Sequence, residues 1–302
     1  MFEEMVEEGA ACCASCGIAE IDDVKLVPCD ACDLVQYCSD ECQQIHKSEH
    51  EEDCTKRAAE LRDELLFKLP ESSHLGDCPI CMIPLSLDPK KSNMNSCCSK
   101  IFCIGCVLAD SIREEEQSLA PSCPFCREPA IRTDEEWDKL RMKRVEMNDP
   151  VALSQKGIGH YQKGDYIRAF ESLTKSAELG AAQAHYHLAL LYQNGHGVEK
   201  DEGKEIHHLE EAAIGGHPGA RHNLGCVEAE NFKVERAVKH WMIAAKQGED
   251  VAVKTLMGFF KLRFVSKDDL AAALRAHKAA VDATKSPQRE AAEEFYRENN
   301  LR

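Results

Sequence analysis

The distribution of the cysteines constrains this chain more than any other feature of its sequence. Sixteen of the 17 cysteines lie in the first 126 residues, and Cys226 lies alone beyond them. Most form Cys-x-x-Cys pairs, whose spacing lets one tight turn present two thiolates to the same metal ion. The acidic start of the chain lacks the basic and apolar stretches of a secretory signal. We therefore expect reduced thiols in the cytoplasm or nucleus, where such pairs usually bind zinc.

The first cysteine cluster contains eight regularly spaced ligands, enough for two tetrahedral zinc sites. They are Cys13, Cys16, Cys29, Cys32, Cys38, Cys42, His50 and Cys54. The steps from Cys38 to Cys42 and from His50 to Cys54 are four residues long, so each places both ligands on one face of a helical turn. Cys12 is left over and is an alternative to Cys13 in the first pair.

Residues 12–54 resemble the MYND zinc finger, most clearly in the segment 37–43, Tyr-Cys-Ser-Asp-Glu-Cys-Gln. The resemblance implies two interleaved sites. One comprises Cys13, Cys16, Cys38 and Cys42, and the other Cys29, Cys32, His50 and Cys54. It also implies binding of short proline-containing peptides, although Lys47 stands where the family usually has a tryptophan.

The second cluster, residues 78–127, resembles the RING finger, which cross-braces two zinc ions. The resemblance implies one site of Cys78, Cys81, Cys103 and Cys106, and a second that includes Cys98, Cys123 and Cys126. The family commonly has a histidine ligand at the position of Lys100, whose ammonium cannot bind zinc at neutral pH. Either Cys97 takes that place or the second site is incomplete.

RING fingers commonly recruit a ubiquitin-conjugating enzyme and position its thioester, with no nucleophile of their own. The resemblance gives the partner-binding roles to Ile80, Pro124 and Arg127, the last of which contacts ubiquitin. Asp110 departs from the family, which often has an apolar residue there. Whether the chain is a ubiquitin-protein transferase therefore stays open, and no residue is assigned as catalytic.

Residues 150–262 contain an internal repeat. Ala152, Ala184, Ala220 and Ala252 occupy equivalent positions at steps of 32, 36 and 32 residues. Each unit reads as two helices, with a small or apolar residue every fourth position on the face toward its neighbour. The pattern resembles the Sel-one-like repeat, a relative of the tetratricopeptide repeat, and implies a solenoid that binds proteins.

The remaining segments are predicted to contain helices. Residues 55–77 and 128–149 are expected to be helical linkers between the modules, with one helix over 56–69 that ends at Pro70 and another over 134–147 that follows a capping box at Thr133. In residues 263–302, Ser266 and Ser286-Pro287 mark the starts of two helices that we expect to cover the end of the repeat stack.

Charge and hydropathy limit the kinds of partner that the chain is expected to bind. Residues 1–150 carry 32 acidic and 16 basic side chains, and the rest of the chain is balanced, so nucleic acid is not expected to bind. No apolar run approaches the roughly 18 residues of a membrane span. The expected fold class is small zinc-stabilised α+β modules followed by an all-α repeat solenoid, with about four zinc ions and protein partners.

Two functions remain open from the sequence. One is an adaptor that acts as a RING-type ubiquitin ligase, with the second finger on a ubiquitin-conjugating enzyme and the repeats on a protein substrate. The other is a non-enzymatic, zinc-stabilised scaffold for protein complexes.

Overall fold

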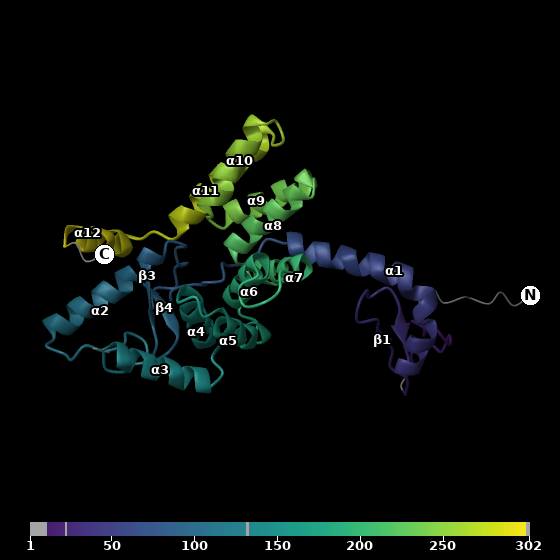
Figure 1. Cartoon of the computed structure of the whole chain (residues 1–302), viewed down its shortest axis with the longest axis horizontal. Helices are drawn as coiled ribbons and strands as arrows, with labels where there is room; N and C mark the ends of the chain where they lie inside the picture. The colour runs from purple at the N-terminus through teal and green to yellow at the C-terminus, as the bar shows by residue number, and fades with distance from the viewer. Residues whose placement is uncertain (1–10, 22, 131–132, 300–302) are drawn as a thin grey trace, which may run out of the picture. The chain divides into compact units, whose positions relative to one another are not determined.

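Two units make up the structure, a computed structural model that describes residues 11–21, 23–130 and 133–299 (Figure 1). In the sequence, the boundary between the two units falls between Lys68 and Leu69. The first unit contains an antiparallel pair of short strands, β1 (Val27–Pro28) and β2 (Gln36–Tyr37), followed by helix α1 (Asp40–Phe67). Ser39 caps α1 by accepting a hydrogen bond from the Cys42 amide.

Helix α1 is longer than the four-residue ligand steps require. It carries the last ligands of the first cluster and continues without a break into the region expected to be a separate helical linker. The helix ends at Phe67, two residues before the predicted end at residue 69, and residues 69–77 form a loop. Pro70 explains the stop, because proline disfavours a helical conformation in the residue before it.

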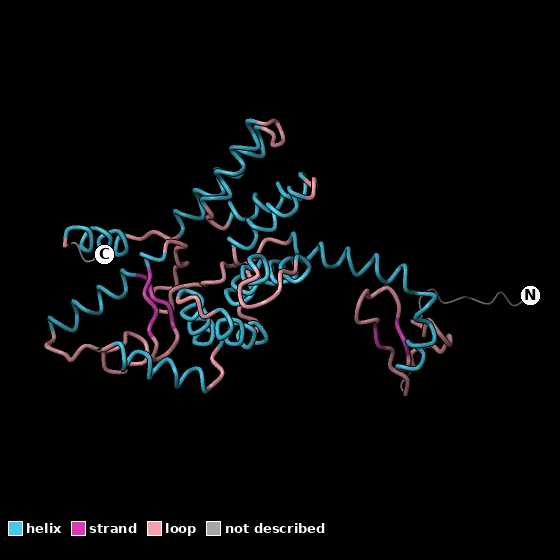
Figure 2. Tube along the Cα trace, in the orientation of Figure 1, coloured by secondary structure: helices cyan, strands magenta, loops and turns pink. Residues whose placement is uncertain are grey.

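The second unit starts with the second cysteine cluster. A short 3₁₀ turn, η1 (Pro89–Lys91), leads into strands β3 (Ser92–Asn95) and β4 (Lys100–Cys103), which pair antiparallel, and then into α2 (Ile104–Glu116) (Figure 2). Phe102 and Leu85 are buried among the cysteines of this cluster. With so small an apolar core, metal ligation has to supply much of the stability.

Helix α3 (Asp134–Glu146), capped by Thr133 as predicted, precedes the repeats. The repeat helices are α4 (Pro150–Gln162), α5 (Tyr166–Glu178), α6 (Ala182–Asn194), α7 (Glu202–Ile214), α8 (Pro218–Glu230), α9 (Val234–Lys246) and α10 (Asp250–Lys261). They pack as hairpins, α4 on α5, α6 on α7 and α8 on α9, and each hairpin packs on the next. The predicted fold class, zinc modules followed by a helical-repeat solenoid, is confirmed.

The last two helices have different neighbours. Helix α11 (Lys267–Ala283) packs on α9 and α10, as expected for a helix that covers the end of the stack. Helix α12 (Pro287–Glu298) packs on α2 of the second finger instead. The sequence contains the caps of both helices, Ser266 and Ser286, but no signal for the surface on which each one packs.

Within the part of the chain that the structure describes, none of the helices combines the length and apolar character needed to cross a membrane.

Candidate metal centres

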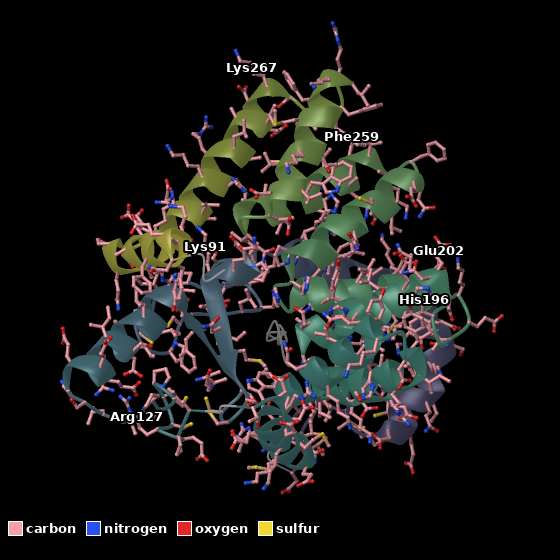
Figure 3. All side chains as sticks on the ribbon, turned by 60° about the vertical axis from the view of Figure 1, so that its left-hand side comes forward. Lys91, Arg127, His196, Glu202, Phe259 and Lys267 are labelled. Atoms are coloured by element: carbon pink, nitrogen blue, oxygen red, sulfur yellow. The ribbon has the colours of Figure 1, made fainter. Side chains whose placement is uncertain are left out.

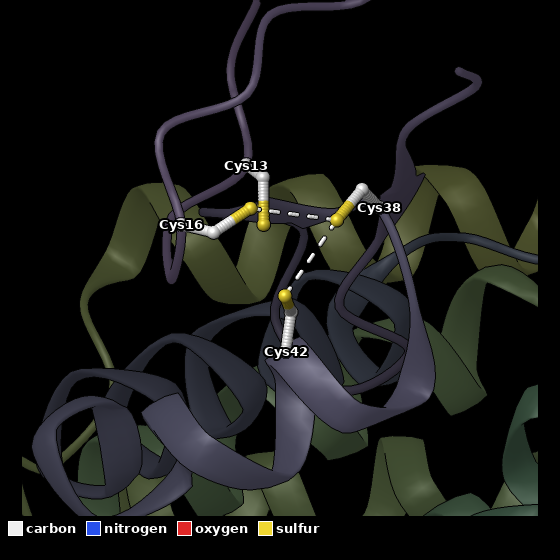
Figure 4. Close-up of side chains that lie close together, drawn as sticks. All are labelled: Cys13, Cys16, Cys38 and Cys42. Atoms are coloured by element: carbon white, nitrogen blue, oxygen red, sulfur yellow. Dashed lines mark hydrogen bonds between the residues drawn. The ribbon is translucent and has the colours of Figure 1, made fainter. Parts of the chain in front are cut away.

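The first group of potential ligands joins a loop to the start of α1. Cys13 and Cys16 lie on the loop, and Cys38 and Cys42 flank the cap of the helix, so that the four sulfur atoms face one another (Figure 4). The sulfur of Cys38 lies 3.5 Å from that of Cys16 and 3.6 Å from that of Cys42. Cys13 is the member of this group, whereas Cys12 is exposed and outside it.

The second group uses the body of α1. Cys29 and Cys32, from the turn after β1, meet His50 and Cys54 on the helix, with Cys32 Sγ 3.1 Å from His50 Nε2. The ring of His46 stacks on that of His50 and its Nδ1 lies 3.1 Å from the Tyr37 hydroxyl. His46 therefore orients the ligand histidine without being a ligand itself.

The third group lies in the second finger and comprises Cys78, Cys81, Cys103 and Cys106. Cys103 caps α2 by accepting a hydrogen bond from the Cys106 amide, which fixes the spacing of that pair. Its sulfur lies 3.8 Å from that of Cys81. Cys78, Cys103 and Cys106 are buried.

The fourth group comprises Cys97, Cys98, Cys123 and Cys126. Cys97 and Cys98 lie in the turn between β3 and β4, with Cys97 3.4 Å from Cys126 and Cys98 3.8 Å from Cys123, measured between sulfur atoms. Of the two alternatives left by the sequence, the geometry is that of the all-cysteine group that includes Cys97. The ammonium of Lys100 lies 6.0 Å from the centre of the Phe125 ring and takes no part.

All four groups fit zinc. The ligand atoms within each group lie no more than 4.8 Å apart. A tetrahedral site with zinc–sulfur bonds of about 2.3 Å has edges of about 3.8 Å, and the sulfur pairs measured here lie 3.4 to 3.8 Å apart. Four cysteines, or three cysteines with one histidine, are usual donor sets for structural zinc, so the chain has places for about four zinc ions.

The electrostatics of the thiols explain why a cation is required. Hydrogen bonding from the Cys16 amide lowers the pKa of Cys13 to about 6, whereas hydrogen bonding with Cys16 and Cys42 raises the pKa of Cys38 to about 12. In the fourth group, burial and the neighbouring Cys126 raise the pKa of Cys97. One thiolate in a group thus suppresses ionisation of the next, and a divalent ion lets all of them ionise together.

The three predicted partner-binding residues lie around the second finger. Ile80 lies between two ligands of the third group and is 42% exposed, and Pro124 lies beside the ligand Cys123 and is partly buried. Arg127, labelled in Figure 3, follows the last ligand and forms a 3.2 Å ion pair with Asp110 on α2. Asp110 also pairs with Arg113 at 2.7 Å. The charge of this carboxylate, at a position where RING fingers often have an apolar residue, is therefore offset by two arginines of the same finger.

Two residues that contact the ligands were missed by sequence reasoning. Asn95 donates a hydrogen bond from Nδ2 to Cys123 Sγ at 3.2 Å, and Arg289 on α12 donates one from Nη2 to Cys81 Sγ at 3.3 Å. Asn95 lies two residues before the ligand Cys97, and this nearness in sequence was the signal that could have identified it. Arg289 lies 208 residues from its sulfur and gave none.

A comparison with protein families agrees with the first finger. The family model described as MYND finger matches residues 13–54. The chain is similar to a Sel1 repeat protein from Oxalobacter formigenes, with 29% identity, 50% of this chain and 65% of that one covered, and a TM-score of 0.43. It is also similar to c5321, a protective antigen of uropathogenic Escherichia coli with an SLR fold, with 20% identity, 55% and 36% covered, and a TM-score of 0.39.

Among curated proteins, the DNA repair protein RAD5 of Yarrowia lipolytica is 29% identical over 106 residues, which cover 32% of this chain. The match spans only 10% of RAD5. The chain thus combines a MYND finger and a second finger of RING-like ligand order with helical repeats.

Proposed function

We propose that this chain is a protein-interaction adaptor that acts as a RING-type ubiquitin ligase. In this proposal the second finger recruits a ubiquitin-conjugating enzyme, and the helical repeats, together with the first finger, hold the protein that receives ubiquitin. Its work is positioning: the thioester on the recruited enzyme is brought close to a substrate lysine, and the chain supplies no nucleophile.

The observation that carries the proposal is the cross-braced order of the two ligand groups in the second finger. The first Cys-x-x-Cys pair, Cys78 and Cys81, shares a group with Cys103 and Cys106. The last pair, Cys123 and Cys126, shares the other group with Cys97 and Cys98, so the two groups alternate along the sequence. Ile80 and Phe125 lie in the two ligand loops and are 42% and 49% exposed. Both are available to contact the recruited enzyme.

Arg127 has to exchange partners in this mechanism. Its side chain is 57% exposed, and its ion pair with Asp110 reaches solvent on the arginine side. Exposed ion pairs contribute only about 0 to 1 kcal/mol, so contact with ubiquitin can replace this one at little cost. Asp110 keeps its second partner, Arg113, and so does not become an isolated buried charge.

The test is chain formation by the full-length protein with a panel of ubiquitin-conjugating enzymes. We expect the wild type to stimulate chain formation and Ile80→Ala or Arg127→Ala to reduce it more than tenfold, with zinc content unchanged. The matched controls are Ile167→Ala on α5, 67% exposed, and Arg168→Ala beside it, which should retain the full rate.

The second candidate function is a scaffold without enzymatic partner, favoured by the charge of Asp110 in a position usually apolar in RING fingers. No stimulation by a zinc-loaded protein across a broad enzyme panel contradicts the ligase proposal and supports the scaffold. We also propose a cytoplasmic or nuclear location, because all 17 cysteines are free and the zinc groups need reduced thiols.

A further inference from the structure

Arg289 is the most completely enclosed charged side chain at the second finger. It lies in the first turn of α12 and is 5% exposed. Its guanidinium donates to three backbone carbonyl oxygens, those of Pro84 at 2.6 Å, Thr284 at 2.7 Å and Ile83 at 2.9 Å. Two of these carbonyls belong to the loop that follows Cys81. Because the guanidinium is planar and rigid, these bonds fix the direction of its remaining N–H groups.

One of those N–H groups points at a metal ligand. Nη2 of Arg289 lies 3.3 Å from Cys81 Sγ, in the group that Cys78, Cys103 and Cys106 complete. Four thiolates around a divalent zinc carry a formal charge of about −2. A cation that hydrogen-bonds one of the sulfur atoms offsets part of that charge and holds the sulfur in its ligating position.

Other contacts hold α12 on the finger without touching sulfur. Gln288 donates to the Gly105 carbonyl at 3.1 Å, and Glu293 forms a 2.8 Å ion pair with Lys91, which lies beside α12 in Figure 3. Gly105 allows the close approach of the helix, because a Cβ there would lie 3.0 Å from the Arg289 backbone nitrogen. Docking of the helix and contact with the sulfur can therefore be separated by mutation.

We propose that Arg289 is a positioning residue of the zinc site formed by Cys78, Cys81, Cys103 and Cys106, and that α12 stabilises this zinc through the contact of Arg289 with Cys81 rather than through docking alone. The C-terminal helix is then a component of the finger, although the whole repeat array lies between them in sequence. A binding partner that displaces α12 would weaken this site and leave the other three zinc sites unaffected.

The test follows zinc release from the full-length protein to an excess of the chromogenic chelator 4-(2-pyridylazo)resorcinol. Contacts to ligands from the surrounding shell typically change metal affinity 10- to 100-fold. We therefore expect Arg289→Met to release one of about four zinc ions at least tenfold faster, with the others unchanged. Arg289→Lys, which keeps the charge, should restore part of the retention.

Two variants serve as matched controls. Gln288→Ala and Glu293→Gln each remove a docking contact and leave Arg289 on Cys81, so they should release zinc at the wild-type rate. In cobalt-substituted protein, Arg289→Met should shift the sulfur-to-cobalt charge-transfer bands, because the hydrogen bond to one sulfur is lost. The two controls should not shift them.

Three outcomes contradict the proposal. The first is wild-type release from Arg289→Met. The second is release as fast from Gln288→Ala as from Arg289→Met, which assigns the effect to helix docking alone. If Arg289→Met does not fold, Arg289→Lys decides, and wild-type release with an unshifted cobalt spectrum overturns the role of Arg289.

Discussion

Gly225 on α8 lies against the side chain of Trp241 on α9. A Cβ at this position would overlap the indole ring of Trp241, which is 1% exposed and donates from Nε1 to the His222 carbonyl at 3.1 Å. Gly258 on α10 is also helical, but nothing lies within 4 Å of a Cβ built there. The two glycines have the same backbone conformation and opposite steric surroundings.

We therefore expect Gly225→Ala to destabilise the repeats by about 1 to 3 kcal/mol, the usual cost of forcing extra volume into a packed core. Gly258→Ala should stabilise them by up to about 1 kcal/mol, because alanine is the better helix former. Urea unfolding of zinc-loaded protein, followed by circular dichroism, measures both. Equal shifts in the two variants would contradict the steric argument.

At the scale of elements, a stack of aromatic rings joins the loop before the second finger to the repeats. His217, which caps α8 by accepting from the Ala220 amide at 3.1 Å, lies between His74 and Tyr186 with both ring centres 4.2 Å away. Burial lowers the pKa of His74 to about 4 and that of His217 well below its usual value. Both rings are therefore neutral in the folded protein at neutral pH.

The pH dependence follows from these directions. An unfolded histidine has a pKa of about 6.5, so the unfolded chain binds protons first as the pH falls. Stability should be complete above about pH 6.5 and decline toward about pH 4, by up to about 3 kcal/mol for His74. His217→Asn retains a capping side chain that does not titrate, so its stability should depend less on pH than that of the wild type.

The measurement is the urea midpoint of wild type and His217→Asn between pH 7.5 and 5, both at saturating zinc. The comparison cancels the acid sensitivity of the zinc sites, which the two proteins share. Parallel pH profiles for the two proteins would contradict the role of the buried stack.

Local sequence signals predict most of the elements and the metal groups. The caps at Thr133, Ser266 and Ser286 mark true helix starts, and the spacing of alanines marks the repeat helices, because both depend on residues close in sequence. The ligand groupings followed from resemblance to known fingers. The contacts of Arg289 were out of reach, because helix α12 has no pattern that distinguishes the finger from the end of the repeat stack as its packing surface.

At the scale of the whole molecule, metal and apolar packing stabilise different parts of the chain. The cores of the two fingers consist largely of the ligand cysteines themselves. The repeat cores contain none of the grouped ligands and are built from buried alanines and larger side chains, such as Leu173 and Leu188 in one cluster and Trp241 and Leu256 in another. Zinc binding is therefore coupled to folding of the fingers and not to folding of the repeats.

Removal of zinc should therefore unfold the chain in part. After treatment with EDTA and a thiol reductant, we expect elemental analysis to find about four zinc ions per chain in the ultrafiltrate. The protein should retain most of its helical circular dichroism signal, because α4 to α11 pack on one another without metal. Limited proteolysis should then cut residues 11–130 rapidly and leave a resistant fragment that begins near α3 or α4. Zinc added back should restore resistance. Loss of all helical signal on chelation would contradict the independence of the repeats, and unchanged proteolysis of residues 11–130 would contradict the coupling of both fingers to the metal.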